Sequence, residues 1–181
     1  MTTGHVFIAT TLDGFVARSD HQIDWLTKQD TKGEGHGFIE FMESVDGLVM
    51  GRGSFLNLLS FEEEWPYAKP VVVLSKSLSA SDVPANLAGR VEISSLDPVA
   101  LMKKLGEDGW SRVYVDGGLV IQSFIRLGLV EDMVLTTVPI LIGDGLRLFG
   151  VIDRDIDLEL LASKSFASGF VQSHYRLVKP R

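Results

Sequence analysis

Short apolar runs alternate with polar, glycine-bearing segments along most of this chain. Runs rich in β-branched and large apolar residues predict buried strands at residues 5–12, 45–50, 71–74, 90–94 and 112–115. Apolar positions at helical spacing predict helices at residues 38–44, from residue 54 onward, at residues 97–105 and after residue 118. Because strand and helix alternate, we expect parallel strands joined by crossover connections.

Two helix starts carry local capping signals. Ser54 follows a glycine turn and is a candidate cap, with Phe55 on the apolar face behind it. Asp97 stands before Pro98, which suits a cap followed by the first helical residue.

The pattern changes in the C-terminal part of the chain. Residues 133–138 predict a strand and residues 139–145 a glycine-bearing turn. Residues 158–166 and 169–178 predict a β-hairpin about Ser168-Gly169. We therefore expect an α/β fold with a mostly parallel mixed sheet, antiparallel at its C-terminal edge, in a single domain over residues 1–181.

Composition limits the possible partners. The 181 residues are 45% hydrophobic and 23% charged, which is typical of an ordinary globular protein. The formal net charge is −7 and the basic residues are scattered, so we expect neither nucleic acid nor a membrane as a partner. A small anionic ligand would need a few well-placed cations and backbone amides.

Cysteine and histidine usage bears on redox and metal chemistry. The chain has no cysteine, so redox chemistry requires an external cofactor. The four histidines show no spacing typical of metal ligands, and we expect no metal site; His5 and His174 are predicted at strand ends. No signal peptide or run of about 20 apolar residues is present, and the cytoplasm is the expected location.

Unusual residues follow four predicted strands. These strand ends are residues 10–14, residues 51–54, Ser75-Lys76 and Asp116-Gly-Gly118. Because ligands gather at the carboxyl ends of parallel strands, we expect the four to share one crevice. Each segment taken alone can instead be a plain turn or helix cap.

Three of these segments suit phosphate groups. Gly51-Arg52-Gly53-Ser54 offers a helix start, a guanidinium and a hydroxyl. Ser75 and Lys76 offer a second phosphate-binding position, and the amides at Gly117-Gly118 offer a third. Three phosphate-binding positions favour a phosphorylated dinucleotide such as NADPH. Neither a G-x-G-x-x-G fingerprint nor a Walker lysine loop is present.

The order of these motifs supports a family resemblance. The motifs are Leu12-Asp-Gly-Phe-Val-Ala17, Val49-Met-Gly-Arg52, Val72-Val-Leu-Ser-Lys76, Val115-Asp-Gly-Gly118, Ser123-Phe-Ile-Arg-Leu-Gly-Leu-Val-Glu-Asp132 and Pro139-Ile-Leu-Ile-Gly-Asp-Gly145. Over nearly its whole length, the chain resembles the dihydrofolate reductase-like superfamily. Within it, the chain is most similar to the riboflavin-biosynthesis reductase domain, the C-terminal half of the bifunctional deaminase-reductase, and its stand-alone relatives. The resemblance implies a three-layer fold with helices on both faces of the sheet.

The resemblance implies NADPH as the cofactor and assigns its contacts. The phosphates would lie at Arg52, Gly53, Ser54, Ser75 and Lys76, beside Gly51. The pyrophosphate would lie at Gly117 and Gly118, followed by Leu119. The end of the first strand would face the nicotinamide through Ala9, Thr10, Asp13 and Gly14.

Candidate catalytic residues on the substrate side are Asp116, Asp24 and Trp25. Asp116 takes the place of a glutamate in the riboflavin enzymes, so it could pair with ring N–H groups, or it could cap the next helix. Trp25 could stack on a substrate ring or belong to the core or a lid. A proton could come from Asp116, Asp24 or water.

These observations predict an NADPH-dependent reductase of a small heterocyclic or ribosylamino compound. The reaction that we expect resembles the reduction of 5-amino-6-(5-phosphoribosylamino)uracil in riboflavin biosynthesis. The alternatives are dihydrofolate or pteridine reduction, and a non-catalytic NADP-binding module. The last gains support because residues 57–66 lack the Asp-Asp-Pro segment of the riboflavin reductases. The resemblance and the edge strands also imply a homodimer.

Overall fold

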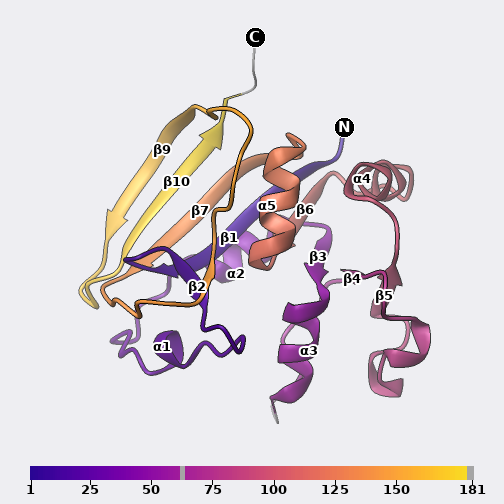
Figure 1. Cartoon of the computed structure of the whole chain (residues 1–181), viewed down its shortest axis with the longest axis horizontal. Coiled ribbons are helices and arrows are strands. Elements are labelled where there is room, and N and C mark those ends of the chain that lie inside the picture. Colours follow the sequence, from indigo (N-terminus) through magenta and orange to yellow (C-terminus); the bar gives the residue numbers. More distant parts are fainter. Residues whose placement is uncertain (62–63, 179–181) are drawn as a thin grey trace.

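The computed structural model describes residues 1–61 and 64–178, so part of the 57–66 segment lies outside the described residues. Figure 1 shows a twisted layer of strands with helices packed on it. Within the described residues the large sheet has eight strands, in the order β5-β4-β3-β6-β1-β7-β10-β9. Their bounds are β5 (Val91–Ser94), β4 (Val71–Leu74), β3 (Gly47–Gly51), β6 (Arg112–Asp116), β1 (Thr3–Thr11), β7 (Val130–Val138), β10 (Val171–Leu177) and β9 (Leu158–Ser165).

The remaining elements connect or flank this sheet. The helices are α1 (Asp24–Thr27), α2 (Phe38–Glu43), α3 (Arg52–Ser60), α4 (Pro98–Glu107) and α5 (Gly118–Arg126), with 3₁₀ turns at Ala80–Asp82 and Ala85–Leu87. A small second sheet pairs β2 (Phe15–Ala17) with β8 (Leu146–Arg147).

Strand pairing follows the predicted mixed pattern. The neighbouring strands β5, β4, β3, β6, β1 and β7 all pair in parallel. β10 pairs antiparallel with both β7 and β9, and this hairpin forms the left edge in Figure 1. Met50 in β3 lies opposite Val73 in β4 and Asp116 in β6, so these three strands end at one edge of the sheet.

Alternating side chains build a core on each face of the sheet. Val49, Val113 and Val115 point to one face, where they pack with apolar residues of α4 and α5. Leu48 and Met50 point to the other, with α3 and partly buried residues of α2. This alternation is what a two-sided buried strand requires. The three-layer fold class predicted from the sequence is confirmed.

Several local predictions need correction. Ser54 does not cap α3, because the helix already begins at Arg52 and Gly51 takes the cap position. The β2–β8 pair and the short helix α1 at residues 24–27 were not predicted. His174 lies within β10 and not at a strand end. Within the described ranges, no helix is long and apolar enough to cross a bilayer.

Candidate functional site

Strands β3, β4 and β6 end beside the starts of α3 and α5 (Figure 1). Residues from these ends line a crevice at this edge of the sheet. Its volume is about 880 Å³. The predicted cofactor residues that line it are Gly51, Arg52, Gly53, Ser54, Ser75, Lys76, Gly117, Gly118 and Leu119. The structure therefore brings together residues from three separate strand ends, and their binding role stays a prediction.

The two glycine turns approach each other closely in this crevice. Gly117 has a φ of 90°, a backbone conformation that residues with a Cβ rarely adopt. A Cβ at Gly117 would lie 2.5 Å from Ser54 Oγ and 3.9 Å from the Gly51 nitrogen. The turn after β6 thus requires glycine both for its backbone shape and for space.

Helices α3 and α5 both begin without a side-chain cap from the described residues. At the start of α4, in contrast, Asp97 accepts hydrogen bonds from the amides of Val99 (3.0 Å) and Ala100 (2.9 Å). Uncapped first-turn amides carry partial positive charge. Two such helix starts at one crevice can hold an anionic group with backbone N–H groups.

Three cations line the same crevice. Arg52 and Lys76 are exposed, and neither side chain has a hydrogen bond or ion pair with another described residue. Arg147 of β8 is the third, with its guanidinium 4.6 Å from the centre of the Phe15 ring. Sequence reasoning missed Arg147, because the β2–β8 pairing brings it to the crevice from a distant part of the chain. Its one sequence signal is the glycine-bearing turn just before it.

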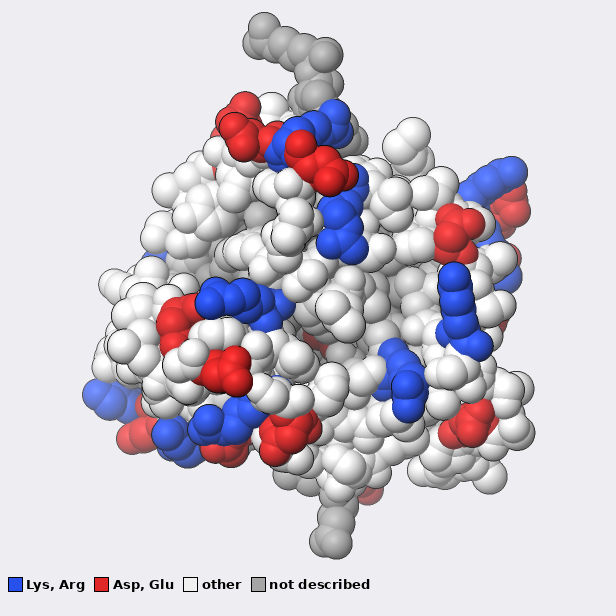
Figure 2. All heavy atoms as spheres, in the orientation of Figure 1, with Lys and Arg blue, Asp and Glu red and all other residues white. Residues whose placement is uncertain are grey.

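The charge of the crevice differs from that of the whole protein. The net charge is −7, and Figure 2 shows acidic and basic side chains interspersed over one face. Asp20 is the single Asp or Glu among the described residues that line the crevice. An anionic ligand would therefore be attracted by local cations and not by the overall field.

Two further residues border the phosphate-suited part of the crevice. Ser75 Oγ accepts hydrogen bonds from the amides of Ser77 (3.2 Å) and Leu78 (3.0 Å), which fixes the hydroxyl oxygen. His21, which sequence reasoning also missed, has a positive φ of 69°. Its ring lies against Gly53, where a Cβ would be 3.0 Å from Cε1. Only this unusual backbone conformation distinguishes His21, and the sequence does not reveal it.

The end of the first strand is not part of the crevice lining. Ala9 and Thr10 lie within β1, and Thr10 is buried. Asp13 accepts hydrogen bonds from the amides of Ile142 (3.1 Å) and Gly143 (2.8 Å). A hydrogen bond from Thr11, together with these amides, lowers the pKa of the Asp13 carboxyl. Gly14 lies near the Arg147 guanidinium, and the predicted nicotinamide contact of all four residues stays a prediction.

Asp116 ends β6 and is partly buried between the sheet and α3. The Tyr114 hydroxyl lies 3.2 Å from Asp116 Oδ1. Burial raises the pKa of the Asp116 carboxyl, although hydrogen bonds from Tyr114, the Gly117 amide and Ser54 oppose this rise. The cap position of α5 belongs to Gly117, so the helix-cap alternative for Asp116 is wrong. Asp116 is a carboxyl group that holds a proton more readily than usual.

The other two substrate-side candidates are engaged within the protein. Asp24 binds Arg18 through both carboxylate oxygens, at 2.6 and 2.9 Å. This hydrogen bonding to Arg18 lowers the pKa of Asp24. Trp25 is 0% exposed and packs with Val138 and Phe170 in a small core cluster. These surroundings match the core alternative for Trp25.

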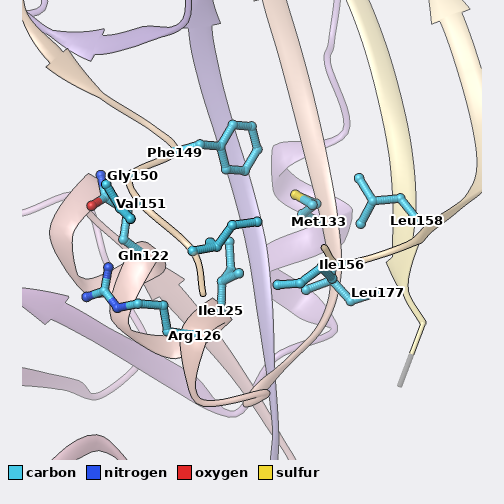
Figure 3. A pocket seen from close by; sticks show the side chains of 11 residues that line it. Gln122, Ile125, Arg126, Met133, Phe149, Gly150, Val151, Ile156, Leu158 and Leu177 are labelled. Carbon is cyan, nitrogen blue, oxygen red and sulfur yellow. The ribbon is translucent and has the colours of Figure 1, made fainter. Parts of the chain in front are cut away.

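An apolar hollow of about 210 Å³ lies on the α5 side of the C-terminal strands. Figure 3 shows Ile125 of α5, Met133 of β7 and Leu158 of β9 around it. Phe149 and Leu158 are 49% and 44% exposed. The hollow contains none of the predicted site residues. Most of its lining is apolar, with Gln122 and Arg126 as polar members, so the hollow suits mainly apolar contact.

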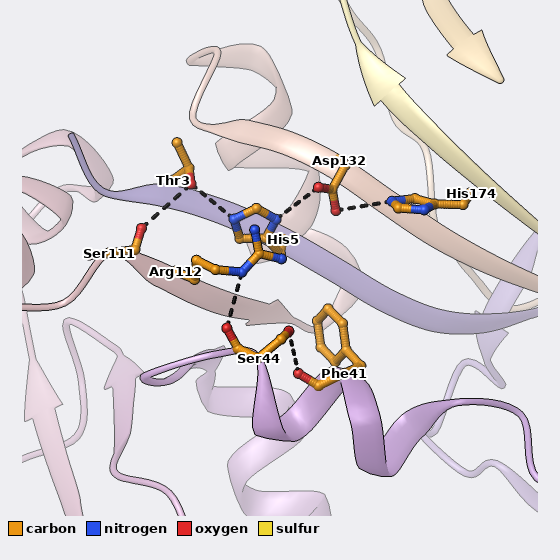
Figure 4. Close-up of polar contacts among 8 residues, drawn as sticks. All are labelled: Thr3, His5, Phe41, Ser44, Ser111, Arg112, Asp132 and His174. Atoms are coloured by element: carbon orange, nitrogen blue, oxygen red, sulfur yellow. Dashed lines mark hydrogen bonds and ion pairs between the residues drawn. The ribbon is translucent and has the colours of Figure 1, made fainter. Parts of the chain in front are cut away.

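A histidine–aspartate network lies away from the crevice, across β1, β7 and β10 (Figure 4). His5 Nδ1 lies 3.1 Å and His174 Nε2 3.5 Å from the carboxylate of Asp132. Thr3 Oγ1 lies 2.9 Å from His5 Nε2. Burial opposes ionisation, yet the His5 contact holds the pKa of Asp132 below its ordinary value. In the described part of the chain, no group of three or more His, Asp or Glu side chains is placed to hold a metal ion.

The chain is similar to known proteins over nearly its whole length. The model of the RibD C-terminal domain family matches residues 3–172. A protein from Shewanella sp. PV-4, provisionally assigned to riboflavin biosynthesis, superposes with a TM-score of 0.91. It is 36% identical, and the match covers 98% of this chain and 100% of that one.

Two more distant structures share the fold. The diaminohydroxyphosphoribosylaminopyrimidine deaminase/5-amino-6-(5-phosphoribosylamino)uracil reductase of Thermotoga maritima superposes with a TM-score of 0.75 at 16% identity, over 98% of this chain and 57% of that one. Dihydrofolate reductase from Enterococcus faecalis, in complex with NADP(H), superposes with a TM-score of 0.67 at 15% identity, over 98% of this chain and 97% of that one. The resemblance inferred from the motifs is confirmed.

Proposed function

We infer, because the chain belongs to the RibD C-terminal domain family, that it is an NADPH-dependent reductase of a small heterocyclic or ribosylamino compound. The reaction that fits best resembles the reduction of 5-amino-6-(5-phosphoribosylamino)uracil, the activity in the name of the T. maritima protein. The observation that carries the proposal is the crevice itself, with two uncapped helix starts and three cations.

The crevice fits the phosphates of NADPH. The first-turn amides of α3 and α5 would hold the pyrophosphate, where Gly117 leaves space that a Cβ would fill. Arg52 and Lys76, which are free of protein partners among the described residues, would hold further phosphate oxygens. When bound, the nicotinamide supplies a hydride. The protein would position the two reactants and exclude water.

Asp116 is the proposed substrate-side carboxyl. Burial raises its pKa, so Asp116 can hold a proton at a pH where Asp24 is ionised. The Arg18 guanidinium lowers the pKa of Asp24, so Asp24 suits an anchor for its loop better than a proton donor. We therefore assign proton transfer, or hydrogen bonding to a ring nitrogen, to Asp116.

A non-catalytic NADP-binding module is the second candidate function. Full burial of Trp25 and the ion pair between Arg18 and Asp24 favour it, because they occupy two of the predicted substrate-side residues. Dihydrofolate or pteridine reduction is a variant of the leading proposal with a different ring. All three possibilities share the same cofactor crevice.

Cofactor titration tests the crevice directly. We expect NADPH to raise the melting temperature, and Arg52→Ala to raise the Kd for NADPH about tenfold or more, since a charge-assisted hydrogen bond is lost. Arg154→Ala, an exposed arginine outside the crevice, is the matched control and should leave the Kd unchanged. No stabilisation by NADPH, or equal effects of the two variants, would contradict the proposal.

A turnover panel separates the candidate functions. NADPH oxidation is followed at 340 nm with pyrimidine, pterin and quinone acceptors, with Asp116→Asn beside the unaltered protein. Turnover that requires Asp116 supports the reductase, and the preferred acceptor separates a pyrimidine from a pterin substrate. Tight NADPH binding with no turnover on any acceptor supports the binding module.

A homodimer in the cytoplasm is the proposed assembly and location. All residues of the edge strand β9 are exposed, and Leu158 and Leu160 are 44% and 56% exposed. An exposed edge with apolar side chains invites pairing with a second copy. Light scattering coupled to gel filtration tests this, with Leu160→Lys as the variant that should yield monomers.

A further inference from the structure

One tyrosine hydroxyl lies between the Asp116 carboxylate and the backbone of β1. Tyr114 Oη is 3.0 Å from the Phe7 carbonyl oxygen and 3.2 Å from Asp116 Oδ1. A phenol has a single proton, so Tyr114 can donate to only one of these two acceptors at a time. Tyr114 is 4% exposed, and its ring packs against Phe41 edge to face. Packing therefore holds the hydroxyl in place between them.

The groups that face Asp116 come from several elements. Tyr114 belongs to β6, and Ser54 of α3 and the Gly117 amide also stabilise the carboxylate. Tyr67, which precedes β4, is buried; burial and the charge of Asp116 raise its pKa. No lysine, arginine or histidine of the described residues forms a salt bridge with Asp116. Its ionised form thus depends on neutral donors, and among them Tyr114 has a side-chain hydrogen bond to it at 3.2 Å.

We propose that Tyr114 is a positioning residue for Asp116: its hydroxyl fixes the ionised carboxylate, and turns to the Phe7 carbonyl when Asp116 takes up a proton. The proton that Asp116 takes up comes from solvent, and in both states the Tyr114 proton stays on its own oxygen with one acceptor, Asp116 Oδ1 or the Phe7 carbonyl oxygen. In the first state Asp116 Oδ1 accepts a hydrogen bond from the Tyr114 hydroxyl, while the Gly117 amide and Ser54 also donate to the carboxylate; a substrate N–H would share these acceptor oxygens. In the second state Asp116 itself becomes a donor. The proposal rests on the function inferred above for Asp116.

The same contact connects Asp116 to strand β1. Phe7 lies in β1 two residues before Ala9, and its carbonyl gains or loses the Tyr114 hydrogen bond as Asp116 titrates. The fixed aromatic packing of Tyr114 lets its hydroxyl proton turn without moving the ring. Proton uptake at Asp116 is thereby paired with a change in the hydrogen bonding of β1.

The test is a carboxyl titration that needs no substrate. Protein with ¹³C-labelled aspartate is titrated by NMR, and the Asp116 signal is assigned by its absence in Asp116→Asn. Tyr114→Phe keeps the ring and removes the hydroxyl, so we expect the acid dissociation constant of Asp116 to fall about threefold to tenfold. Tyr67→Phe is the matched control and should shift it much less. Equal shifts in the two variants, or no shift in Tyr114→Phe, would overturn the proposal.

A second measurement retains the hydroxyl and covers the possibility that Tyr114→Phe does not fold. Incorporation of 3-fluorotyrosine in the Tyr67→Phe background makes Tyr114 a stronger donor, so the pKa of Asp116 should fall. An unchanged or raised pKa would overturn the proposal. NADPH binding is measured on the same samples, so a protein that fails to bind NADPH refutes the proposed function while the Tyr114 test is still decided by the titration.

Discussion

Backbone amides are satisfied in two different ways in this protein. Away from the crevice, single carboxylates each bind two consecutive amides: Asp13 binds those of Ile142 and Gly143, Glu34 those of Ala167 and Ser168, Asp46 those of Ser111 and Arg112, and Asp97 those of Val99 and Ala100. At the crevice, the starts of α3 and α5 have no such carboxylate among the described residues. The two helix starts are exceptions to a device that this chain uses repeatedly.

The difference indicates what the crevice is suited to bind. A carboxylate and a phosphate oxygen offer the same kind of acceptor to an amide pair. Where the protein supplies its own acceptor, the turn or helix is complete by itself. Where it supplies glycine and nearby arginine, as at Gly51-Arg52, the acceptor comes from outside the chain, as water or as the ligand proposed above. Substitutions at either kind of site therefore test this difference.

The largest expected effect is that of Gly117→Ala. A Cβ at this position meets Ser54 Oγ at 2.5 Å in a backbone with a φ of 90°. We expect a loss of about 2–3 kcal/mol in the free energy of unfolding and a rise of about a hundredfold in the Kd for NADPH.

Gly109→Ala is the control for Gly117→Ala. Gly109 also has a φ of 90°, but a Cβ there would meet no atom within 4 Å. The Gly109→Ala variant should lose about 1 kcal/mol in the free energy of unfolding from backbone strain alone, and it should bind NADPH normally. Denaturant unfolding and cofactor titration measure both quantities, and normal NADPH binding by Gly117→Ala would break the contrast.

A cap introduced at the crevice should separate stability from binding. Gly51 has the extended conformation of a helix cap, with φ −85° and ψ 165°. Gly51→Asp in a Val120→Ala background, which removes the methyl group 2.9 Å from the new Cβ, should cap α3 and place a negative charge at the phosphate position. We expect a Kd for NADPH about tenfold higher than in Val120→Ala, and a stability equal or greater by about 0.5 kcal/mol. Tighter NADPH binding would contradict the assignment of this helix start.

Removal of an existing cap should lower stability without changing NADPH binding. Asp97→Ala deprives two amides of their acceptor, so we expect a loss of about 1 kcal/mol in the free energy of unfolding. The increase in melting temperature caused by NADPH should stay the same, because α4 does not line the crevice. Asp153→Ala, an exposed aspartate in a loop, serves as the control. An altered NADPH response in Asp97→Ala would mean that the two kinds of site are coupled.

The smallest effect concerns acid stability. Hydrogen bonds from the Arg112 and Ser111 amides lower the pKa of the Asp46 carboxyl. The unfolded chain therefore binds a proton at Asp46 more readily, so the stability from this group is present above about pH 4 and is lost as the pH falls through the lowered folded pKa. Asp46→Asn should lower stability at pH 7 and weaken its decline below about pH 4. Urea unfolding between pH 3 and pH 7 measures this, and identical pH profiles would contradict it.

Local signals predicted much of the fold. Asp97-Pro98 specifies a helix start through neighbouring residues, and the structure has that cap. The parallel strands follow from apolar runs whose burial is a property of a few adjacent residues, and the C-terminal hairpin follows from two strand-like runs about the Ser168-Gly169 turn. The prediction of Ser54 as the cap is wrong because Gly51 and Ser54 can both precede a helix. In the structure α3 begins at Arg52, and the Gly51 turn lies close to Gly117, a contact that the sequence does not reveal.

Features that depend on distant partners were less accessible. Arg147 reaches the crevice only because β8 pairs with β2, a contact between short segments with no strong pattern. The engagement of Asp24 by Arg18 and the full burial of Trp25 depend on how the loop after β2 folds back. In an open loop, the same residue types could contact a substrate. The sequence alone therefore left open whether Asp24 and Trp25 have a substrate-side role or a structural one.

The uncapped starts of α3 and α5 would make the stability of the protein depend on its ligand. A ligand that binds only the folded chain stabilises it by about 2.7 kcal/mol when its concentration is 100 times its Kd. If the missing acceptor is supplied from outside, the unliganded molecule is the one that opens more often to proteases. With NADPH as the ligand, as proposed above, the abundance of this protein would then follow the supply of NADPH in the cell.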